Sequence, residues 1–406
     1  MAISAAAVGE ARVLSRALAG ATVLQLVPSL RDDAMARATV DIAYALVRAG
    51  ARAIVGGENG PLVAKLRSFG GEWLALSSAT INPLTLRRNA ETIETFVANE
   101  RVDIVHAKNA GAAWSALVAT DRTGALLVTD LPDLPQTRMR LAAFYLGALS
   151  RGDRIIACSQ YVARPMVDRY RIPPERLSII PRSIDIAQFD PTGVRPERVA
   201  ALRQAWGIPS GVRIVLVPGR LAPWNGQITL VHAARLLTAN GMRGVTFVFA
   251  GDDRRYRPYV RAIVKRAQAE GVDPLFRFVG HCPDMAAAYA AGEFVVTPAV
   301  SPPMYGRAVA EAQAMARPVI ASSIGPLPEN LLAPPRMPDD LRTGWLVRPG
   351  DANELARTLA AALALDAPAY RALAARARQF GEFMFAPHRV ATATLEVYSS
   401  LLAVER

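Results

Sequence analysis

The sequence predicts an α/β fold made of two doubly wound parallel sheets, one in each half of the chain. Short β-branched runs alternate with Ala-, Leu- and Arg-rich stretches of helical spacing, which is the pattern of parallel strands with helices on both faces. A segment with several Pro and Gly residues, 189–209, interrupts this pattern once before it starts again. A chain of 406 residues with 51% hydrophobic content is long enough for two domains with separate cores.

The first domain is predicted to cover residues 1–190. A long helix is expected at residues 34–49, directly after the first strand. The strands of this half are predicted at residues 21–27, 52–55, 104–106, 126–129, 155–158 and 177–180.

The second domain is predicted to cover residues 191–385 and to begin with a short helix inside the Pro- and Gly-containing segment. Its strands are predicted at residues 213–217, 246–250, 276–279, 294–297, 319–321 and 345–347.

The last segment, residues 386–406, is predicted to be an amphipathic helix. Its apolar side chains recur at helical intervals and form a stripe that needs a surface to pack on. The stripe consists of Val390, Ala391, Leu395, Tyr398 and Leu402.

The formal charge of +12 comes almost wholly from Arg, since Lys occurs only as Lys65, Lys108 and Lys265. A positive field favours anionic partners such as nucleoside diphosphates or phospholipid headgroups, so peripheral contact with a membrane stays open. No basic stripe interleaved with aromatic residues accompanies the charge, and we expect no nucleic acid partner. Solvated Arg side chains are the simplest interpretation of the excess.

No apolar stretch approaches the roughly 20 residues that a membrane-spanning helix needs. Glu10, Arg12 and Arg16 interrupt the Ala-rich N-terminus, so no secretory signal is predicted. We expect a cytoplasmic protein, with the inner face of the membrane as the alternative location. Cys158 and Cys282 lack the spacing of metal ligands, so neither a disulfide nor a metal site is predicted.

Four blocks of the second half share the motifs of one enzyme family. They are residues 217–227 (VPGRLAPWNGQ), 278–285 (FVGHCPDM), 298–311 (PAVSPPMYGRAVAE) and 321–329 (ASSIGPLPE). These blocks resemble the nucleotide-sugar domain of family 4 glycosyltransferases. In the first half, residues 39–50, 102–107, 113–116 and 151–159 also resemble that family, so the resemblance extends over most of the chain.

The resemblance implies the GT-B fold, in which two Rossmann-like domains face each other across a cleft and the C-terminal helix crosses back to the N-terminal domain. It also implies retaining transfer of a sugar from a UDP-, GDP- or ADP-linked donor to a cell-envelope glycan or lipid acceptor, without a cofactor. In this family the leaving phosphate is thought to help deprotonate the acceptor, so no single protein base is indispensable.

Sugar transfer leaves a nucleoside diphosphate whose growing charge must be stabilised by a metal, by cations or by oriented amides. No Asp-x-Asp metal motif is seen, so a helix N-terminus is the expected alternative, with residues 305–308 as its first turn. Gly306 would let the backbone approach the phosphates, and Arg220 at the end of a strand would bind them. Glu311 is suited to accept hydrogen bonds from the ribose. The nucleotide-sugar site implied by the resemblance comprises Gly219, Arg220, His281, Tyr305, Gly306, Arg307 and Glu311.

Each of these residues also has an ordinary explanation, as a surface Arg, a loop Gly or a solvated helix Glu. Together they favour a site, because ligands of open α/β sheets bind beyond the carboxyl ends of the strands.

Four positions depart from the family pattern. Asn225 stands in place of the Lys that accompanies the Arg on the diphosphate, and losing one such donor raises the barrier by roughly 2.7 to 4 kcal/mol. Pro303 replaces the Glu that contacts the donor sugar, and it offers neither a carboxylate nor a backbone N–H. Pro132 falls where the family has a His. Asp33 lies in a loop where the family has paired Gly.

On the acceptor side, the first domain offers Asp33, Arg37, His106 and Asp133 as candidates. His106 closes a strand and could contact the acceptor, although a buried structural His explains it equally well. Asp130 or Asp133 is also a candidate base for an altered, inverting reaction, but Asp beside Pro is common in turns.

Two classes of function remain after these comparisons. The first is a family 4 transferase, which the donor-side residues support. The second is a binding or scaffold protein of the same fold that acts beside an active partner glycosyltransferase, which the four substitutions favour. A sugar-nucleotide epimerase is a weaker third class, because its paired acid and base residues cannot be identified in this sequence.

Overall fold

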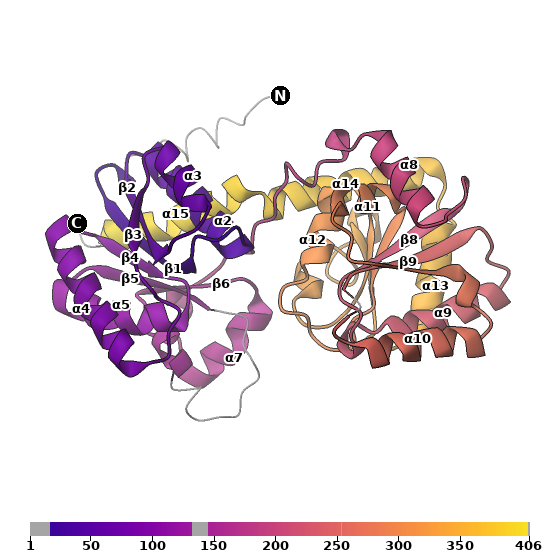
Figure 1. The fold of residues 1–406 in the computed structure, drawn as a ribbon, viewed down its shortest axis with the longest axis horizontal. Helices are drawn as coiled ribbons and strands as arrows, with labels where there is room; N and C mark the ends of the chain where they lie inside the picture. Colours follow the sequence, from indigo (N-terminus) through magenta and orange to yellow (C-terminus); the bar gives the residue numbers. More distant parts are fainter. Residues whose placement is uncertain (1–16, 132–144, 253, 405–406) are drawn as a thin grey trace. The chain divides into compact units, whose positions relative to one another are not determined.

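The structure is a computed structural model that describes residues 17–131, 145–252 and 254–404 (Figure 1). The chain divides into two compact units. Unit 1 contains Met1–Ser183 together with Pro387–Arg406, and unit 2 contains Ile184–Ala386. Each unit is built on its own parallel sheet.

Unit 1 has a seven-stranded sheet in the order β3-β2-β1-β4-β5-β6-β7, and all neighbouring strands are parallel. The strands are β1 (Thr22–Ser29), β2 (Arg52–Glu58), β3 (Glu72–Ala75), β4 (Ile104–Ala107), β5 (Leu126–Leu131), β6 (Arg154–Ala157) and β7 (Leu177–Ile179). The α-helices of the described part are α2 (Ala34–Arg48), α3 (Leu62–Ser68), α4 (Pro83–Glu100), α5 (Ala110–Thr123), α7 (Gln160–Tyr170) and α15 (Pro387–Val404).

Helices cover both faces of this sheet. Ile104 and Val128 belong to the core that the sheet forms with α2, α3 and α15, whereas Val105 and Leu127 belong to the core on the opposite face, with α4, α5 and α7. This split follows from the alternation of side chains along a strand. The same alternation turns His106 and Asp130 toward the face that α2 and α15 cover.

The C-terminal helix α15 packs beside α2, where Figure 1 shows it in yellow against the indigo start of the chain. Its predicted apolar stripe is buried in the core of unit 1 at Val390, Ala391, Leu395 and Tyr398. The prediction that the final helix returns to the first half of the chain is therefore confirmed.

Unit 2 has a six-stranded parallel sheet in the order β10-β9-β8-β11-β12-β13. The strands are β8 (Arg213–Pro218), β9 (Val245–Ala250), β10 (Phe276–Gly280), β11 (Phe294–Thr297), β12 (Val319–Ser322) and β13 (Gly344–Val347). The α-helices of the described part are α8 (Pro196–Ala205), α9 (Gln227–Ala239), α10 (Arg257–Ala269), α11 (Met285–Ala291), α12 (Arg307–Ala314), α13 (Ala352–Leu363) and α14 (Ala367–Phe385).

Both sheets change their winding direction at one place. In unit 1 the chain moves outward from β1 to β3 and then returns to place β4 beside β1; in unit 2 the corresponding neighbours are β8 and β11. Ligands of such sheets bind outside the carboxyl ends of the strands at this switch point. The loops after β1, β4, β8 and β11 are therefore the places to look for binding sites.

The predicted strands are all present, with bounds that differ by a few residues, and the short helix of the interrupting segment is α8. Strand β3 was missed; it has only four residues, and none of them is fully buried. The helix whose first turn was predicted at residues 305–308 begins at Arg307 instead, since Gly306 has a left-handed backbone conformation that caps it. Phe189 and Ile208, near the ends of the interrupting segment, are buried in the core of unit 2.

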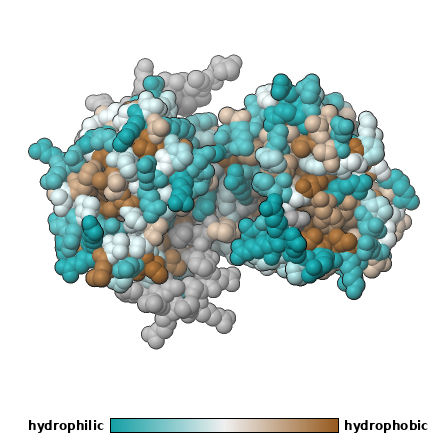
Figure 2. All heavy atoms as spheres, in the orientation of Figure 1, coloured by the Kyte–Doolittle hydropathy of each residue, from teal (hydrophilic) through white to brown (hydrophobic). Residues whose placement is uncertain are grey.

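The visible face of each unit mixes hydrophilic and hydrophobic side chains rather than presenting one continuous apolar surface (Figure 2). Among the described helices, none is long and apolar enough to cross a membrane.

Two candidate binding sites at the carboxyl edges of the sheets

The first candidate site lies at the switch point of unit 2 and begins with the turn after β8. Arg220 is exposed there, and its backbone carbonyl accepts hydrogen bonds from Asn225 Nδ2 (2.7 Å) and Gln227 Nε2 (3.1 Å). Gly219, which precedes it, has a φ of 119° that favours glycine. The two side-chain amides close the turn.

The loop after β11 is fastened to this turn. The N–H groups of Val300 and Ser301 both donate to the carbonyl oxygen of Trp224, at 2.9 and 3.1 Å. Gly226 allows the close approach, because a Cβ at this position would lie 1.9 Å from the oxygen of Pro298. The structure thus brings the Arg220 turn beside the loop that leads into α12.

Helix α12 starts from a backbone conformation that only glycine adopts easily. Gly306 has a φ of 80°, and a Cβ there would lie 2.7 Å from both Asn330 Nδ2 and Leu327 Cδ2. Asn330 Nδ2 also donates to the carbonyl of buried Tyr305 at 2.5 Å. The first N–H groups of a helix have no acceptor within it, and its dipole favours an anion at this end.

Glu311 and Arg307 lie on the first turns of α12 and contact each other. Glu311 Oε1 accepts from Arg307 Nε at 2.5 Å, and Oε2 accepts from Tyr289 Oη at 2.9 Å. Burial raises the pKa of Glu311, although Arg307 and Tyr289 act in the opposite direction. The Glu311 side chain is only 8% exposed, whereas that of Arg307 is 61% exposed. Contact of Glu311 with a ribose therefore stays a prediction, and Arg307 is the more accessible group.

The remaining donor-side residues lie around these loops. His281 is exposed in the loop after β10, whose Gly280 carbonyl accepts from Gly251 N–H after β9. Pro303 is half-buried against the loop after β12, where a Cβ on Gly325 would lie 3.5 Å from Pro303 Cδ. His281 is thus separated from the β11 loop by two intervening strands.

On unit 1, two acceptor-side candidates serve the start of α2. Asp33 is the N-cap of this helix and accepts from the N–H of Ala36 at 2.9 Å. Arg37 donates twice to Asp32, at 2.5 and 2.8 Å, and this hydrogen bonding lowers the pKa of Asp32. Both residues therefore have local structural partners.

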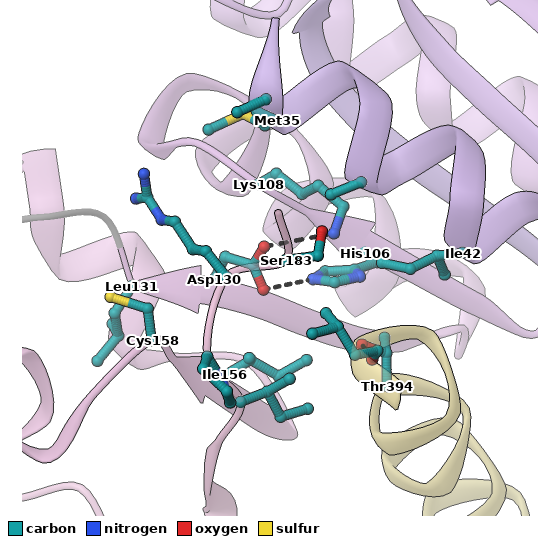
Figure 3. A pocket seen from close by; sticks show the side chains of 16 residues that line it. Met35, Ile42, His106, Lys108, Asp130, Leu131, Ile156, Cys158, Ser183 and Thr394 are labelled. Carbon is teal, nitrogen blue, oxygen red and sulfur yellow. Dashed lines mark hydrogen bonds and ion pairs between the residues drawn. The ribbon is translucent and has the colours of Figure 1, made fainter. Parts of the chain in front are cut away.

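His106 is the centre of a buried chain of hydrogen bonds. Its Nδ1 lies 2.5 Å from Tyr398 Oη of α15. Its Nε2 lies 2.7 Å from Asp130 Oδ1 of β5, which Figure 3 marks with a dashed line. The second oxygen of Asp130 contacts Lys108 Nζ at 3.3 Å. Tyr398, His106 and Lys108 are at most 6% exposed, whereas the Asp130 side chain is 30% exposed.

The protonation states of this chain follow from burial and charge. Burial lowers the pKa of His106, and the charge of Lys108 adds to the effect, so we assign the neutral ring. Burial alone would raise the pKa of Asp130, but Lys108 and His106 outweigh it and hold that pKa well below its ordinary value. Burial also raises the pKa of Tyr398, so its O–H donates to Nδ1 while Nε2–H donates to ionised Asp130.

A cavity of about 110 Å³ opens beside Asp130 and Lys108. Figure 3 shows Met35 and Ile42 of α2, Ile156 of β6 and Thr394 of α15 around it. Its wall continues through Cys158 and residues 180–183. This second candidate site occupies the carboxyl edge of β4, β5 and β6.

Lys108 and Tyr398 were not expected from the sequence as members of the hydrogen-bonded chain around His106. A signal existed for Lys108, which is one of three Lys residues in an Arg-rich chain and lies two positions after His106 at a strand end. Tyr398 gave no such signal, because a tyrosine in an apolar helical stripe looks like any core residue. Pro132 and Asp133 lie outside the described residues.

Within residues 17–131, 145–252 and 254–404, no group of three or more His, Cys, Asp or Glu side chains is arranged to hold a metal ion.

Sequence comparisons place both halves of the chain in known families. Residues 35–188 match the family described as Glycosyltransferase Family 4, and residues 212–364 match Glycosyl transferases group 1. A D-inositol 3-phosphate glycosyltransferase of Saccharomonospora viridis is 27% identical over 300 residues, which cover 71% of this chain and 64% of that protein. The chain thus spans less than two thirds of this relative's length.

Structural comparisons agree with the family matches. A glycosyltransferase from Rickettsia africae superposes with a TM-score of 0.77 and 25% identity, over 94% of this chain and 99% of the other. HepE of Anabaena, solved with UDP and glucose, superposes with a TM-score of 0.67 and 22% identity, over 94% of this chain and 100% of the other. At this sequence identity, the similarity to HepE shows a shared fold alone.

Proposed function

Because the chain belongs to family 4 of the glycosyltransferases, we propose that it transfers a sugar from a nucleotide-sugar donor held by unit 2 to a hydroxyl group of an acceptor held by unit 1. The observation that carries the proposal is the pair of joined loops after β8 and β11. They place exposed Arg220 on a turn that is hydrogen-bonded to the loop leading into α12, where Arg307 is also exposed.

This arrangement suits the departure of a nucleoside diphosphate. The charge that develops on the leaving phosphate is stabilised by the two guanidinium groups and by the first amides of α12. Gly306 keeps side-chain atoms away from the helix start. UDP is the first nucleotide to test, since the HepE structure contains it.

The acceptor is proposed to be a cell-envelope glycan or a lipid-linked hydroxyl compound. D-inositol 3-phosphate, which the name of the Saccharomonospora viridis relative contains, adds a phosphorylated polyol to the acceptors worth testing. A lipid-linked acceptor would require contact with the inner face of a membrane, for which the basic composition is favourable.

Calorimetric titration of the full chain with UDP, GDP and ADP tests the donor site. We expect at least one of them to bind with a micromolar to low-millimolar dissociation constant. If none binds at millimolar concentration, the proposal fails.

A binding role without transfer is the second candidate, and the placement of Asn225 favours it. The amide of Asn225 already donates to the Arg220 carbonyl, so it is committed to the turn rather than to a phosphate. Incubation with UDP-glucose separates the two functions. Release of UDP, by transfer or by hydrolysis, supports the transferase, whereas tight UDP binding with no release supports the binding role.

A further inference from the structure

The cavity of unit 1 combines a charged corner with an apolar wall. Lys108 and Asp130 form the corner, and Ile42, Ile156, Ile180 and Val390 contribute to the wall. The volume of about 110 Å³ is enough for about four water molecules, or for one hydroxylated ring to enter part of the way.

The corner offers both kinds of hydrogen-bonding group that a hydroxyl needs. Asp130 is 30% exposed and has acceptor lone pairs that His106 and Lys108 do not use. The Lys108 side chain is 6% exposed and has three N–H donors, one of which is directed to Asp130. A hydroxyl group that donates to the carboxylate and accepts from the ammonium group fits both.

The same geometry argues against two other uses of Asp130. A carboxyl group whose pKa is held well below its ordinary value is a poor general base, because a base works best with a pKa near the operating pH. The Asp130 carboxylate neutralises Lys108 at this corner and disfavours an anion there, while Arg182 contributes a second cation to the lining. We therefore argue the site from the hydrogen-bonding groups of the Asp130–Lys108 pair, which suit a neutral hydroxyl group.

We propose that this cavity binds a hydroxylated ring, a sugar or a cyclitol, through the Asp130–Lys108 pair, with the isoleucine wall against the C–H face of the ring. Its assignment as the acceptor ring rests on the proposed transfer. Tyr398 and His106 are positioning residues, because their hydrogen bonds hold Asp130 in place from α15 and β4; of the two, His106 also lines the cavity.

Cys158 provides a direct readout, because it lines the cavity and is not part of a disulfide. The full chain is treated with iodoacetamide in the presence of myo-inositol or methyl α-glucoside, and alkylation of each cysteine is followed by peptide mass spectrometry. Cys282 of unit 2 is the internal control, and betaine at equal concentration controls for general solute effects. We expect the rings to slow alkylation of Cys158 several-fold and to leave Cys282 unchanged.

Two variants locate the effect. Asp130→Asn should require about tenfold more ring for the same protection, because a charge-assisted hydrogen bond is lost. Asp121→Asn, on the exposed end of α5, is its matched control and should behave as wild type. Ala38→Phe leaves the Asp130–Lys108 pair in place but fills the cavity, so alkylation should be slow and independent of added ring.

D-inositol 3-phosphate and inorganic phosphate complete the test. Tighter protection by the phosphorylated ring than by myo-inositol supports the proposal and adds a phosphate contact. Protection by inorganic phosphate alone would overturn it, because the cavity would then be an anion site. Equal alkylation of Cys158 with and without any ring would overturn it as well.

Failure of ring binding and failure of the proposed sugar transfer give different results. Lost ring protection with intact UDP binding refutes this inference alone. Ring protection without nucleotide binding refutes the transferase and leaves a ring-binding site in unit 1.

Discussion

The carboxyl edges of the two sheets differ in the exposure of their charged groups, although the first six strands of unit 1 and the six strands of unit 2 follow the same order. In unit 1 the charged groups lie mostly inside and are paired with each other, as in the chain from Tyr398 through His106 and Asp130 to Lys108. In unit 2, Arg220 is exposed after β8, and Arg307 at the start of α12 is 61% exposed although its Nε donates to Glu311.

This difference indicates that the two edges suit different classes of ligand. An exposed cation beside a helix N-terminus favours a highly charged anion such as a diphosphate. A buried, internally neutralised pair offers directional hydrogen bonds without a strong net field, which suits neutral hydroxyl groups. If both proposals hold, the same fold supports two chemistries because the loops after equivalent strands carry different residues.

Gly306→Ala should show the largest effect, because it should disrupt the start of α12 at the carboxyl edge of the unit 2 sheet. The new Cβ combines a positive φ with contacts of 2.7 Å, so we expect the free energy of unfolding of unit 2 to fall by about 2 to 3 kcal/mol. Urea unfolding of the variant measures this change. Gly241→Ala is the control, because its φ of 88° is similar but nothing lies within 4 Å of the added Cβ. It should cost only about 1 kcal/mol, and equal costs for the two variants would contradict the steric account.

Arg220→Ala should weaken UDP binding by about 2 kcal/mol, roughly 30-fold, because a charge-assisted contact to phosphate is lost. Calorimetry against wild type gives the value. Arg243→Ala removes the same charge from an exposed position just before the amino end of β9 and should have little effect. Equal losses in both variants would show that only the general positive field matters.

The pH dependence of the free energy of unfolding should report on buried His106 in unit 1. Burial holds the pKa of His106 below 6.5, so the unfolded chain binds a proton more readily as the pH falls through this value. The free energy of unfolding is therefore unaffected above pH 6.5 and decreases below it. His106→Gln should make this decrease shallower, whereas His281→Gln, in an exposed loop, should not. An unchanged slope in His106→Gln would mean that another group dominates.

Asn225→Lys should give the smallest effect. It should increase the difference in charge between the carboxyl edges of the two sheets by adding a cation to unit 2. The new ammonium group gains a contact with phosphate, while the hydrogen bond to the Arg220 carbonyl is lost. The difference favours UDP binding by about 1 kcal/mol. Weaker binding in a titration would show that the closed turn matters more than the charge.

The sequence was sufficient for the architecture because hydrophobic periodicity reports directly on which face of an element is buried. Resemblance to family motifs directed attention to the loops after β8 and β11, which contain Gly219, Arg220 and Gly306; binding of a nucleotide by these residues stays a prediction. It could not show that Glu311 is buried against Tyr289, because burial of a helix carboxylate depends on α11 packing beside it. Nor could it pair Tyr398 with His106, which lie 292 residues apart in the chain.

Hydrogen exchange of the full chain with and without saturating UDP tests the central claim most directly. We expect slower exchange of backbone amides in residues 219–227 and 298–311, and unchanged exchange in residues 104–131 of unit 1. Protection confined to unit 1, or none in the two unit 2 segments at a UDP concentration that calorimetry shows to be saturating, would contradict the claim that unit 2 holds the nucleotide.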